Sequence, residues 1–196
     1  MIFTSFEFLI FLPLVFAFYW ILPQKYSYRN KLILAASYFF YGFWDWRFLG
    51  LIFFSSAVDF LLAKQIQNAT LKKSKILLYS SLIINLGLLG VFKYYNFFLE
   101  NFVEAFTFFG NPIDINRIDI ILPVGISFYT FQTLSYTIDV YKKTLKPSNN
   151  FVEFAAYVSF FPQLVAGPIE RASNLLPQFK KEKKFEYNKG VLGLKQ

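Results

Sequence analysis

The stretch that decides how this chain folds is FFPQLVAGPIER, residues 160–171, which ends an apolar segment that begins at residue 151. Two prolines, a glutamine and a glycine interrupt the stretch, and Glu170 and Arg171 close it. Proline removes a backbone donor and clashes with the preceding helical turn, so an uninterrupted membrane span would not carry this pattern. The stretch therefore predicts a broken helix inside an apolar region.

The chain as a whole is highly apolar. Its 196 residues are 56% hydrophobic and 22% aromatic, and the mean hydropathy is +0.41. A soluble core of this length cannot hide so much apolar surface. We therefore expect an all-α, polytopic integral membrane protein in contact with the lipid bilayer. The net charge of +8 does not indicate a nucleic-acid partner, because the basic residues form short clusters between apolar runs, as in membrane loops.

The apolar runs predict five membrane spans. We expect them at residues 8–22, 31–44, 48–63, 76–92 and 120–141. A further apolar run, residues 97–109, contains Glu100 and Glu104 and has only 13 residues. Because it is too short to cross a hydrocarbon core of about 30 Å, we interpret it as an amphipathic helix on the membrane surface.

The distribution of basic residues predicts the orientation. Of the 20 Lys and Arg residues, 17 lie in segments 23–31, 64–75, 142–150 and 170–196. By the positive-inside rule these segments are cytoplasmic and the N-terminus is outside. Both ends of segment 151–168 then lie on one side, which predicts a re-entrant segment. Its 11 residues before Pro162 would reach about 16 Å, roughly half the hydrocarbon depth.

The fifth predicted span carries a row of polar residues. Gln132, Ser135, Tyr136 and Asp139 recur at i, i+3, i+4 and i+7, so they share one helix face. Such a row is costly against lipid and should face protein or water. Structural support and the lining of a functional chamber are equally compatible with this pattern.

Polar residues in two other spans have a simpler interpretation. Asp59 lies about one helical turn from Ser55 and Ser56, and Asn85 lies one turn from Ser81. Such side chains commonly join neighbouring membrane helices through hydrogen bonds. We expect interhelical contacts here rather than a site.

The chain contains no cysteine and no histidine. The first absence leaves no thiolate nucleophile and no zinc site of the usual kind. The second removes both the commonest general base and the commonest metal ligand. We therefore expect no catalytic residue and no metal site in this chain.

Four stretches resemble the membrane-bound O-acyltransferase (MBOAT) family, and within it the bacterial alginate O-acetyltransferase branch. They are MIFTSFEFLIFLPLVFAFYWILP (1–23), FKYYNFFLENF (92–102), LPVGISFYTFQTLSYTIDVYK (122–142) and YVSFFPQLVAGPIER (157–171). The resemblance implies a ring of helices around a thin waist in the bacterial plasma membrane. It also implies a cytoplasmic funnel for an acyl donor, acetyl-CoA or an acyl-carrier thioester, and an outward funnel for a polysaccharide acceptor. Members of this branch usually work beside an extracytoplasmic acetyltransferase.

The resemblance assigns chamber-lining or structural roles to particular residues. These are Gln132, Tyr136, Asp139, Pro162, Gln163, Gly167, Pro168 and Arg171. In the family a histidine further along the chain is the general base, and this chain has none. We therefore interpret residues 1–196 as the N-terminal portion of a single MBOAT domain whose catalytic part is absent, and expect the chain alone to be inactive. A non-catalytic docking subunit is the alternative, and a transporter component is less favoured because the spans show no inverted repeat.

Overall fold

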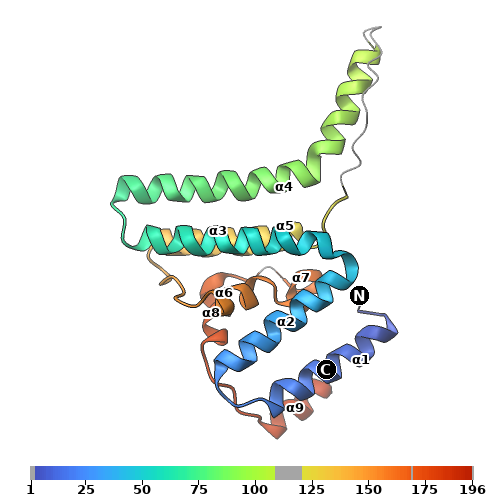
Figure 1. Cartoon of the computed structure of the whole chain (residues 1–196), viewed down its shortest axis with the longest axis vertical. Coiled ribbons are helices and arrows are strands. Elements are labelled where there is room, and N and C mark those ends of the chain that lie inside the picture. Colours follow the sequence, from blue (N-terminus) through green and yellow to red (C-terminus); the bar gives the residue numbers. More distant parts are fainter. Residues whose placement is uncertain (1–2, 109–120, 169, 196) are drawn as a thin grey trace.

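In a computed structural model, which describes residues 3–108, 121–168 and 170–195, the chain is helical and the described residues form no strand (Figure 1). The helices are α1 (Phe6–Ile21), α2 (Tyr26–Asp45), the 3-10 turn η1 (Trp46–Phe48), α3 (Leu49–Gln67), α4 (Leu71–Phe108), α5 (Ile126–Tyr141), α6 (Phe151–Val158), α7 (Phe161–Ala166), α8 (Ala172–Phe179) and α9 (Tyr187–Leu194). The apolar stretches Tyr26–Gln67 and Leu71–Phe108 are long enough to cross a membrane. The all-α prediction is confirmed for the part of the chain that is described.

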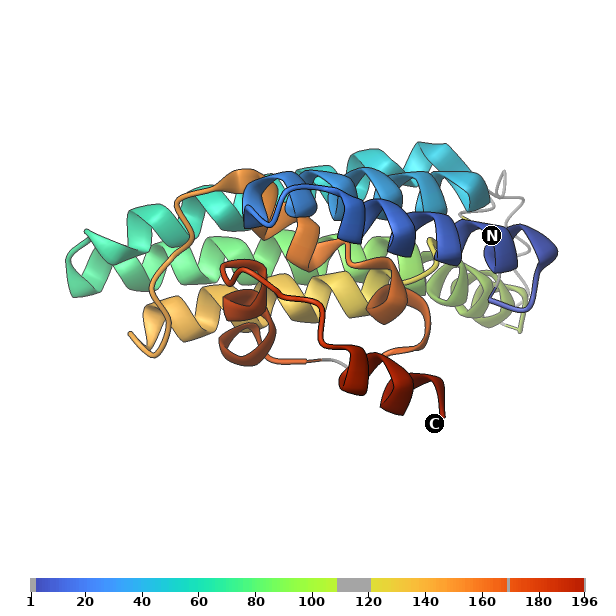
Figure 2. The ribbon, with the colours of Figure 1, turned by 90° about the horizontal axis from the view of Figure 1, so that it is seen from below.

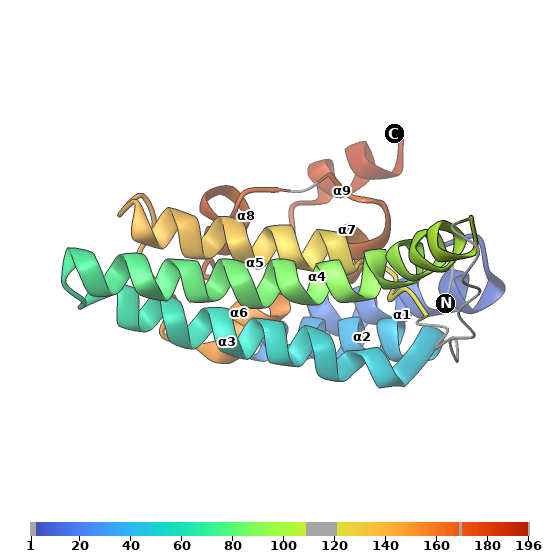
Figure 3. The ribbon, with the colours of Figure 1, turned by 90° about the horizontal axis from the view of Figure 1, so that it is seen from above.

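The long helices form a layer against which the short helices pack. Helices α3, α4 and α5 lie side by side, as Figures 1 and 3 show. The short helix α6 packs against α2 and α3, and α8 packs against both α5 and α6. Figure 2 shows α1 and α2 along one side of the molecule and the C-terminal helices along the other.

The most deeply buried element is the short helix α6. Phe154, Ala156, Tyr157 and Val158 are all 0% exposed. By contrast, α1 has no buried residue, and Phe6 and Ile21 are 74% and 77% exposed. The exposed apolar side chains of α1 suit a lipid surface, whereas α6 is enclosed by protein.

The basic clusters lie in or beside connections that are on one side of the molecule. The α1–α2, α3–α4 and α5–α6 connections are all on the left in Figure 1, while the N-terminus and the α2–α3 connection are on the right. This arrangement is the one that alternate crossing by successive helices would produce.

The second predicted span begins too late. Helix α2 starts at Tyr26, not at residue 31, so its first turn contains the polar residues Arg29 and Asn30. Both residues are buried. Their polar groups are satisfied there, since Arg29 donates to the carbonyl oxygen of Lys183 and Asn30 donates to that of Phe179. Contacts with a distant segment therefore stabilise a helical turn that hydropathy does not mark.

The prediction of a separate surface helix was wrong for residues 97–108. This segment is the end of α4, one helix of 38 residues. Residues 91–108 contain neither proline nor glycine, so no helix breaker separates the two predicted elements. At 1.5 Å per residue α4 is about 57 Å long, far more than a hydrocarbon core, and its end turns away from α3 and α5 in Figure 1. Residue 109 lies outside the described part.

The fifth predicted span begins too early in the chain. Helix α5 starts at Ile126, after Pro123 and a glycine, Gly125, whose φ is 75°. That left-handed conformation favours glycine, and the Gly125 carbonyl accepts the first-turn bond from the N–H of Tyr129 at 3.1 Å. Residue 120, where the prediction began, lies outside the described part.

The broken segment is confirmed, but the predicted position of the break was wrong. Helix α6 ends at Val158, and Pro162 lies in the first turn of α7, where its missing N–H costs nothing. The break is at Ser159 and Phe160, and the hydroxyl of Ser37 on α2 accepts the freed N–H of Phe161 at 3.2 Å. Gly167 ends α7, and the chain then turns back so that α8 contacts α6.

Candidate functional site

The polar face of α5 packs against the broken segment. Gln132 and Tyr136 are 1% and 0% exposed. The hydroxyl of Tyr157 on α6 donates to the carbonyl of Gln132 at 3.4 Å, and Ser135 accepts the N–H of Ala172 at 3.4 Å. The row therefore faces protein, as predicted.

Asp139 takes a different position from the other members of this row. It lies half-buried in the last turn of α5, and its Oδ2 atom has no hydrogen-bond partner among the described residues. Its carbonyl accepts the N–H groups of Thr144 and Leu145 at 3.0 and 3.2 Å. The carbonyl of Asp139 therefore shapes the turn that leaves α5, while its carboxylate keeps a buried, unpaired oxygen among the described residues.

Tyr136 connects three elements. Its ring lies 4.4 Å from that of Phe154, centroid to centroid, and its hydroxyl accepts the backbone N–H of Ser148 at 2.9 Å. The Ser148 hydroxyl donates to Oε1 of Glu153 at 2.8 Å, and Nζ of Lys180 lies 3.5 Å from the same oxygen. These contacts hold the α5–α6 connection and the end of α8 against α6.

The predicted residues of the broken segment form a compact turn. The Nε2 atom of Gln163 donates to the carbonyl of Pro168 at 2.9 Å, and a Cβ on Gly167 would lie 2.8 Å from Cα of Gln163. Only glycine fits there without a shift. Pro168 and Arg171 are exposed, so their side chains are not part of the buried interface with α5.

Two buried amide oxygens have no partner in the described part of the chain. They are Oε1 of Gln132 on α5 and Oε1 of Gln163 on α7. A buried acceptor without a donor is costly, and most such groups in proteins are satisfied. Like Oδ2 of Asp139, these oxygens can therefore accept a hydrogen bond from a bound molecule.

The opposite face of α5 carries a second polar row, which the sequence reasoning missed. Thr137 donates to Oδ1 of Asp59 at 3.1 Å, and Thr133 donates to Oδ1 of Asn85 at 3.4 Å. The spacing of these threonines, one turn apart on α5, was the available signal. The interhelical contacts expected of Asp59 and Asn85 are confirmed, and Ser81 also donates to Asp59.

Ser55 and Ser56 differ in outcome. Ser55 donates to Oδ1 of Asn85 at 2.7 Å, as an interhelical contact. The hydroxyl of Ser56 is buried but has no partner among the described residues, so the contact expected of it is not formed there. The described residues contain no group of three His, Cys, Asp or Glu side chains that could hold a metal ion.

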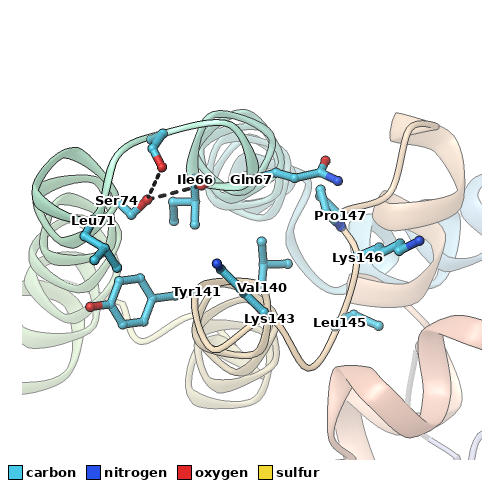
Figure 4. Close-up of a pocket in the computed structure, with 11 residues that line it drawn as sticks. Ile66, Gln67, Leu71, Ser74, Val140, Tyr141, Lys143, Leu145, Lys146 and Pro147 are labelled. Atoms are coloured by element: carbon cyan, nitrogen blue, oxygen red, sulfur yellow. Dashed lines mark hydrogen bonds between the residues drawn. The ribbon is translucent and has the colours of Figure 1, made fainter.

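A cavity of about 510 Å³ opens between the α3–α4 connection and the end of α5 (Figure 4). Its lining combines apolar side chains such as Ile66 and Val140 with the polar groups of Gln67, Lys143 and Lys146. Figure 4 shows Lys143 pointing into this group of side chains and Lys146 pointing away from it. The volume lies within the range of about 300–1,000 Å³ usual for small-molecule sites.

These long apolar helices, with polar faces buried between them, define a helical membrane protein. No family model and no solved structure matches the chain. Curated relatives do match it, and three of them are described next. The chain is 39% identical over 183 residues to a probable alginate O-acetylase of Azotobacter vinelandii, covering 91% of this chain and 36% of that protein. It is 38% identical over 183 residues to a probable alginate O-acetylase of Pseudomonas aeruginosa, and the match covers 91% of this chain and 34% of that protein. It is 35% identical over 216 residues to a peptidoglycan O-acetyltransferase of Helicobacter pylori, and the match covers 94% of this chain and 40% of that protein.

These relatives are enzymes of the membrane-bound O-acyltransferase (MBOAT) type, and the chain is similar to them over almost its whole length. It spans little more than a third of the length of the relatives it matches. The resemblance noted from the sequence motifs is confirmed by these comparisons.

Proposed function

We propose that the chain is part of a membrane O-acyltransferase that moves an acetyl or other acyl group from a cytoplasmic donor to a hydroxyl of an exported polysaccharide. The names of the relatives support an alginate-like or cell-wall acceptor. The observation that carries the proposal is the buried interface between α5 and the broken segment, where Gln132 and Gln163 keep unpaired amide oxygens.

Within this reaction the chain builds the chamber. Tyr136 and Gly167 fix the positions of α5 and the α7 turn, and the two glutamine oxygens accept hydrogen bonds from a bound acceptor hydroxyl or donor amide. Attack of a hydroxyl on an acyl carbonyl also needs a proton acceptor. The chain contains no histidine, so we assign that base to a segment outside it.

The cavity at the end of α5 is the proposed approach for the donor. Acetyl-CoA and acyl-carrier thioesters both carry phosphate, which the ammonium group of Lys143, pointing into the cavity, would attract. The basic connections at the same end of the molecule support a cytoplasmic location for the cavity.

The same arrangement supports the proposed topology. The chain enters α6 near the basic end, runs through α7 and returns, so that α8 contacts α6. This course agrees with a re-entrant segment in a wall of a larger MBOAT ring, with the N-terminus outside the bacterial plasma membrane. An extracytoplasmic acetyltransferase that completes the transfer is the proposed partner.

The proposal is tested by joining this chain to the remaining C-terminal part of the Azotobacter vinelandii relative. The chimera is expressed in a bacterium that lacks its own alginate O-acetylase, and the acetyl content of the alginate is measured. We expect the chimera to restore acetylation and the chain alone to restore none. A chimera that reaches the membrane but yields unacetylated alginate would count against the proposal, and turnover by the chain alone would show that the base lies within it.

A further inference from the structure

Arg29, in the first turn of α2, is buried without an acidic partner. Arg29 is only 3% exposed, and in the described part of the chain no carboxylate lies within ion-pair distance of its guanidinium. The rings of Tyr19 and Trp20 flank the guanidinium, with centroids 4.8 and 5.0 Å away. Stacking on aromatic faces positions the charge but does not neutralise it.

Most of the hydrogen-bonding capacity of Arg29 is unused. An arginine side chain has five N–H groups. Among the described residues, the Arg29 side chain makes one hydrogen bond, from Nη1 to the carbonyl oxygen of Lys183 at 2.6 Å. Its Nε atom is buried and has no partner among the described residues. A buried cation with free donors is expensive unless an anion pairs with it.

A small cavity adjoins this guanidinium and is lined by further cations. Arg29, Lys181 and Lys183 line it, with Tyr26 and Gln178 as additional polar groups and no carboxylate in the described lining. Its volume is about 150 Å³. Because small-molecule sites usually measure about 300–1,000 Å³, this one suits a single charged group rather than a whole nucleotide.

The N-terminus of α2 adds to the positive potential. The cap residue Lys25 makes no side-chain capping bond, and the first turn has no acidic residue. The free N–H groups and the dipole of a 20-residue helix favour an anion at this position. Three independent sources of positive charge therefore meet at one cavity: the buried Arg29, the tail lysines and the helix end.

The position of the cavity indicates which anion would enter it. It lies where the α1–α2 connection meets the C-terminal tail, at the end of the molecule with the basic connections (Figures 1 and 2). Its lining includes the apolar side chains of Ile33, Phe160 and Leu175 and the rings of Tyr19 and Tyr26. Tyrosine rings and basic side chains at the end of an apolar helix are typical of the lipid headgroup layer.

We propose that this cavity binds the phosphate of an anionic phospholipid headgroup, with Arg29 as the principal ligand and Lys181 and Lys183 as secondary ones. The acyl chains stay in the bilayer beside α1 and α2, so only the headgroup enters. Bound phosphate pairs the buried charge and clamps the tail that follows α8 onto α2. This inference does not depend on the proposed acyltransferase activity.

The test measures lipid binding by native mass spectrometry of the detergent-solubilised chain. The probes are dioleoylphosphatidylglycerol, dioleoylglycerol, which has the same chains without phosphate, and inorganic phosphate. We expect the phosphatidylglycerol to stay bound and the other two to bind at least about tenfold more weakly, because charge-assisted bonds to phosphate are strong. Equal binding of dioleoylglycerol would overturn a phosphate site, and equal binding of inorganic phosphate would overturn the lipid as its source.

Three substitutions locate the site. Arg29→Gln should weaken phosphatidylglycerol binding about tenfold. Lys31→Gln removes the same charge from an exposed position on the same helix and should leave binding within about twofold. If Arg29→Gln does not fold, Lys181→Gln in the exposed tail serves instead and should weaken binding about threefold. Unchanged phosphatidylglycerol binding in Arg29→Gln would overturn the proposal. If that variant does not fold, unchanged binding in Lys181→Gln would do the same.

Discussion

Asn85 donates a hydrogen bond from Nδ2 to Oδ2 of Asp59 at 2.8 Å, and this contact joins α4 to α3 inside the apolar bundle. The other carboxylate oxygen accepts from Ser81 on α4 and from Thr137 on α5. Both oxygens of a fully buried carboxyl group are thus satisfied by neutral donors on two neighbouring helices. A one-residue shift of any of the three helices would break the cluster, so it fixes their mutual register.

Replacing Asn85 by alanine should destabilise the chain. The substitution removes the donor to Asp59 and the acceptor for Ser55, and leaves buried polar groups without partners. We expect a loss of about 1–2 kcal/mol in the free energy of unfolding, measured in mixed detergent micelles. Ser80→Ala on the same helix is the control, because the Ser80 hydroxyl donates to the carbonyl of Ile76 within α4 and bonds no other helix in the described part of the chain. If both variants unfold alike, the cluster does not stabilise the bundle.

Gly167→Ala should destabilise the turn that ends α7. An added Cβ would lie 2.8 Å from Cα and 2.9 Å from Cγ of Gln163. The φ of Gly167 is −84°, which alanine adopts freely, so the cost is steric and should be about 1–3 kcal/mol. Gly50→Ala is the matched control, since a Cβ there meets no atom within 4 Å, and it should be neutral or stabilising. Thermal unfolding in detergent compares the two, and equal midpoints would contradict the steric account.

Local patterns were sufficient to predict some features of this structure. The 3.6-residue spacing identified the face of α5 on which Gln132 and Tyr136 lie, and both are buried there. The interhelical role of Asp59 followed from the cost of an unpaired carboxylate within an apolar span. These inferences succeeded because each depends on neighbours within one helix and on the identity of the surrounding solvent.

Features that depend on distant residues could not be predicted in this way. The break before α7 is stabilised by Ser37, which lies 124 residues before Phe161 in the chain. From the sequence alone, Pro162 is interpreted as a residue that breaks a helix. In the structure it lies in the first turn of α7, where proline is well tolerated. In the same way, the bonds from Arg29 to Lys183 and from Asn30 to Phe179 at the end of α8 explain why α2 begins before its apolar run.

Tyr136→Phe should loosen the connection between α5 and α6. The phenol hydroxyl accepts the N–H of Ser148, a residue that is 0% exposed, and phenylalanine leaves that donor unpaired. We expect faster amide hydrogen exchange at Ser148 and a loss of about 1–2 kcal/mol in stability. Tyr129→Phe is the control, because the Tyr129 hydroxyl is buried without a partner among the described residues, so its removal should cost nothing. Unchanged exchange at Ser148 in Tyr136→Phe would mean that the bond does not protect it.

The re-entrant topology predicts that both flanks of the broken segment face the same side of the membrane. Asn149 and Asn174 are exposed on those flanks, whereas Ser148 is buried and unsuitable for labelling. The chain has no native cysteine, so single variants Asn149→Cys and Asn174→Cys can be labelled with a membrane-impermeant maleimide in right-side-out and inverted vesicles. We expect both to react only in inverted vesicles.

Trp46→Cys provides the reference for the opposite side in the same experiment. Trp46 is 75% exposed in the turn between α2 and α3, at the end of the molecule away from the basic connections. It should react only in right-side-out vesicles, because the positive-inside rule places that end outside. Labelling of Asn149→Cys and Asn174→Cys from opposite sides would instead make α6 and α7 parts of a complete span. The unpaired oxygen of Gln163 would then belong to a crossing helix, and the proposed chamber wall would have to be abandoned.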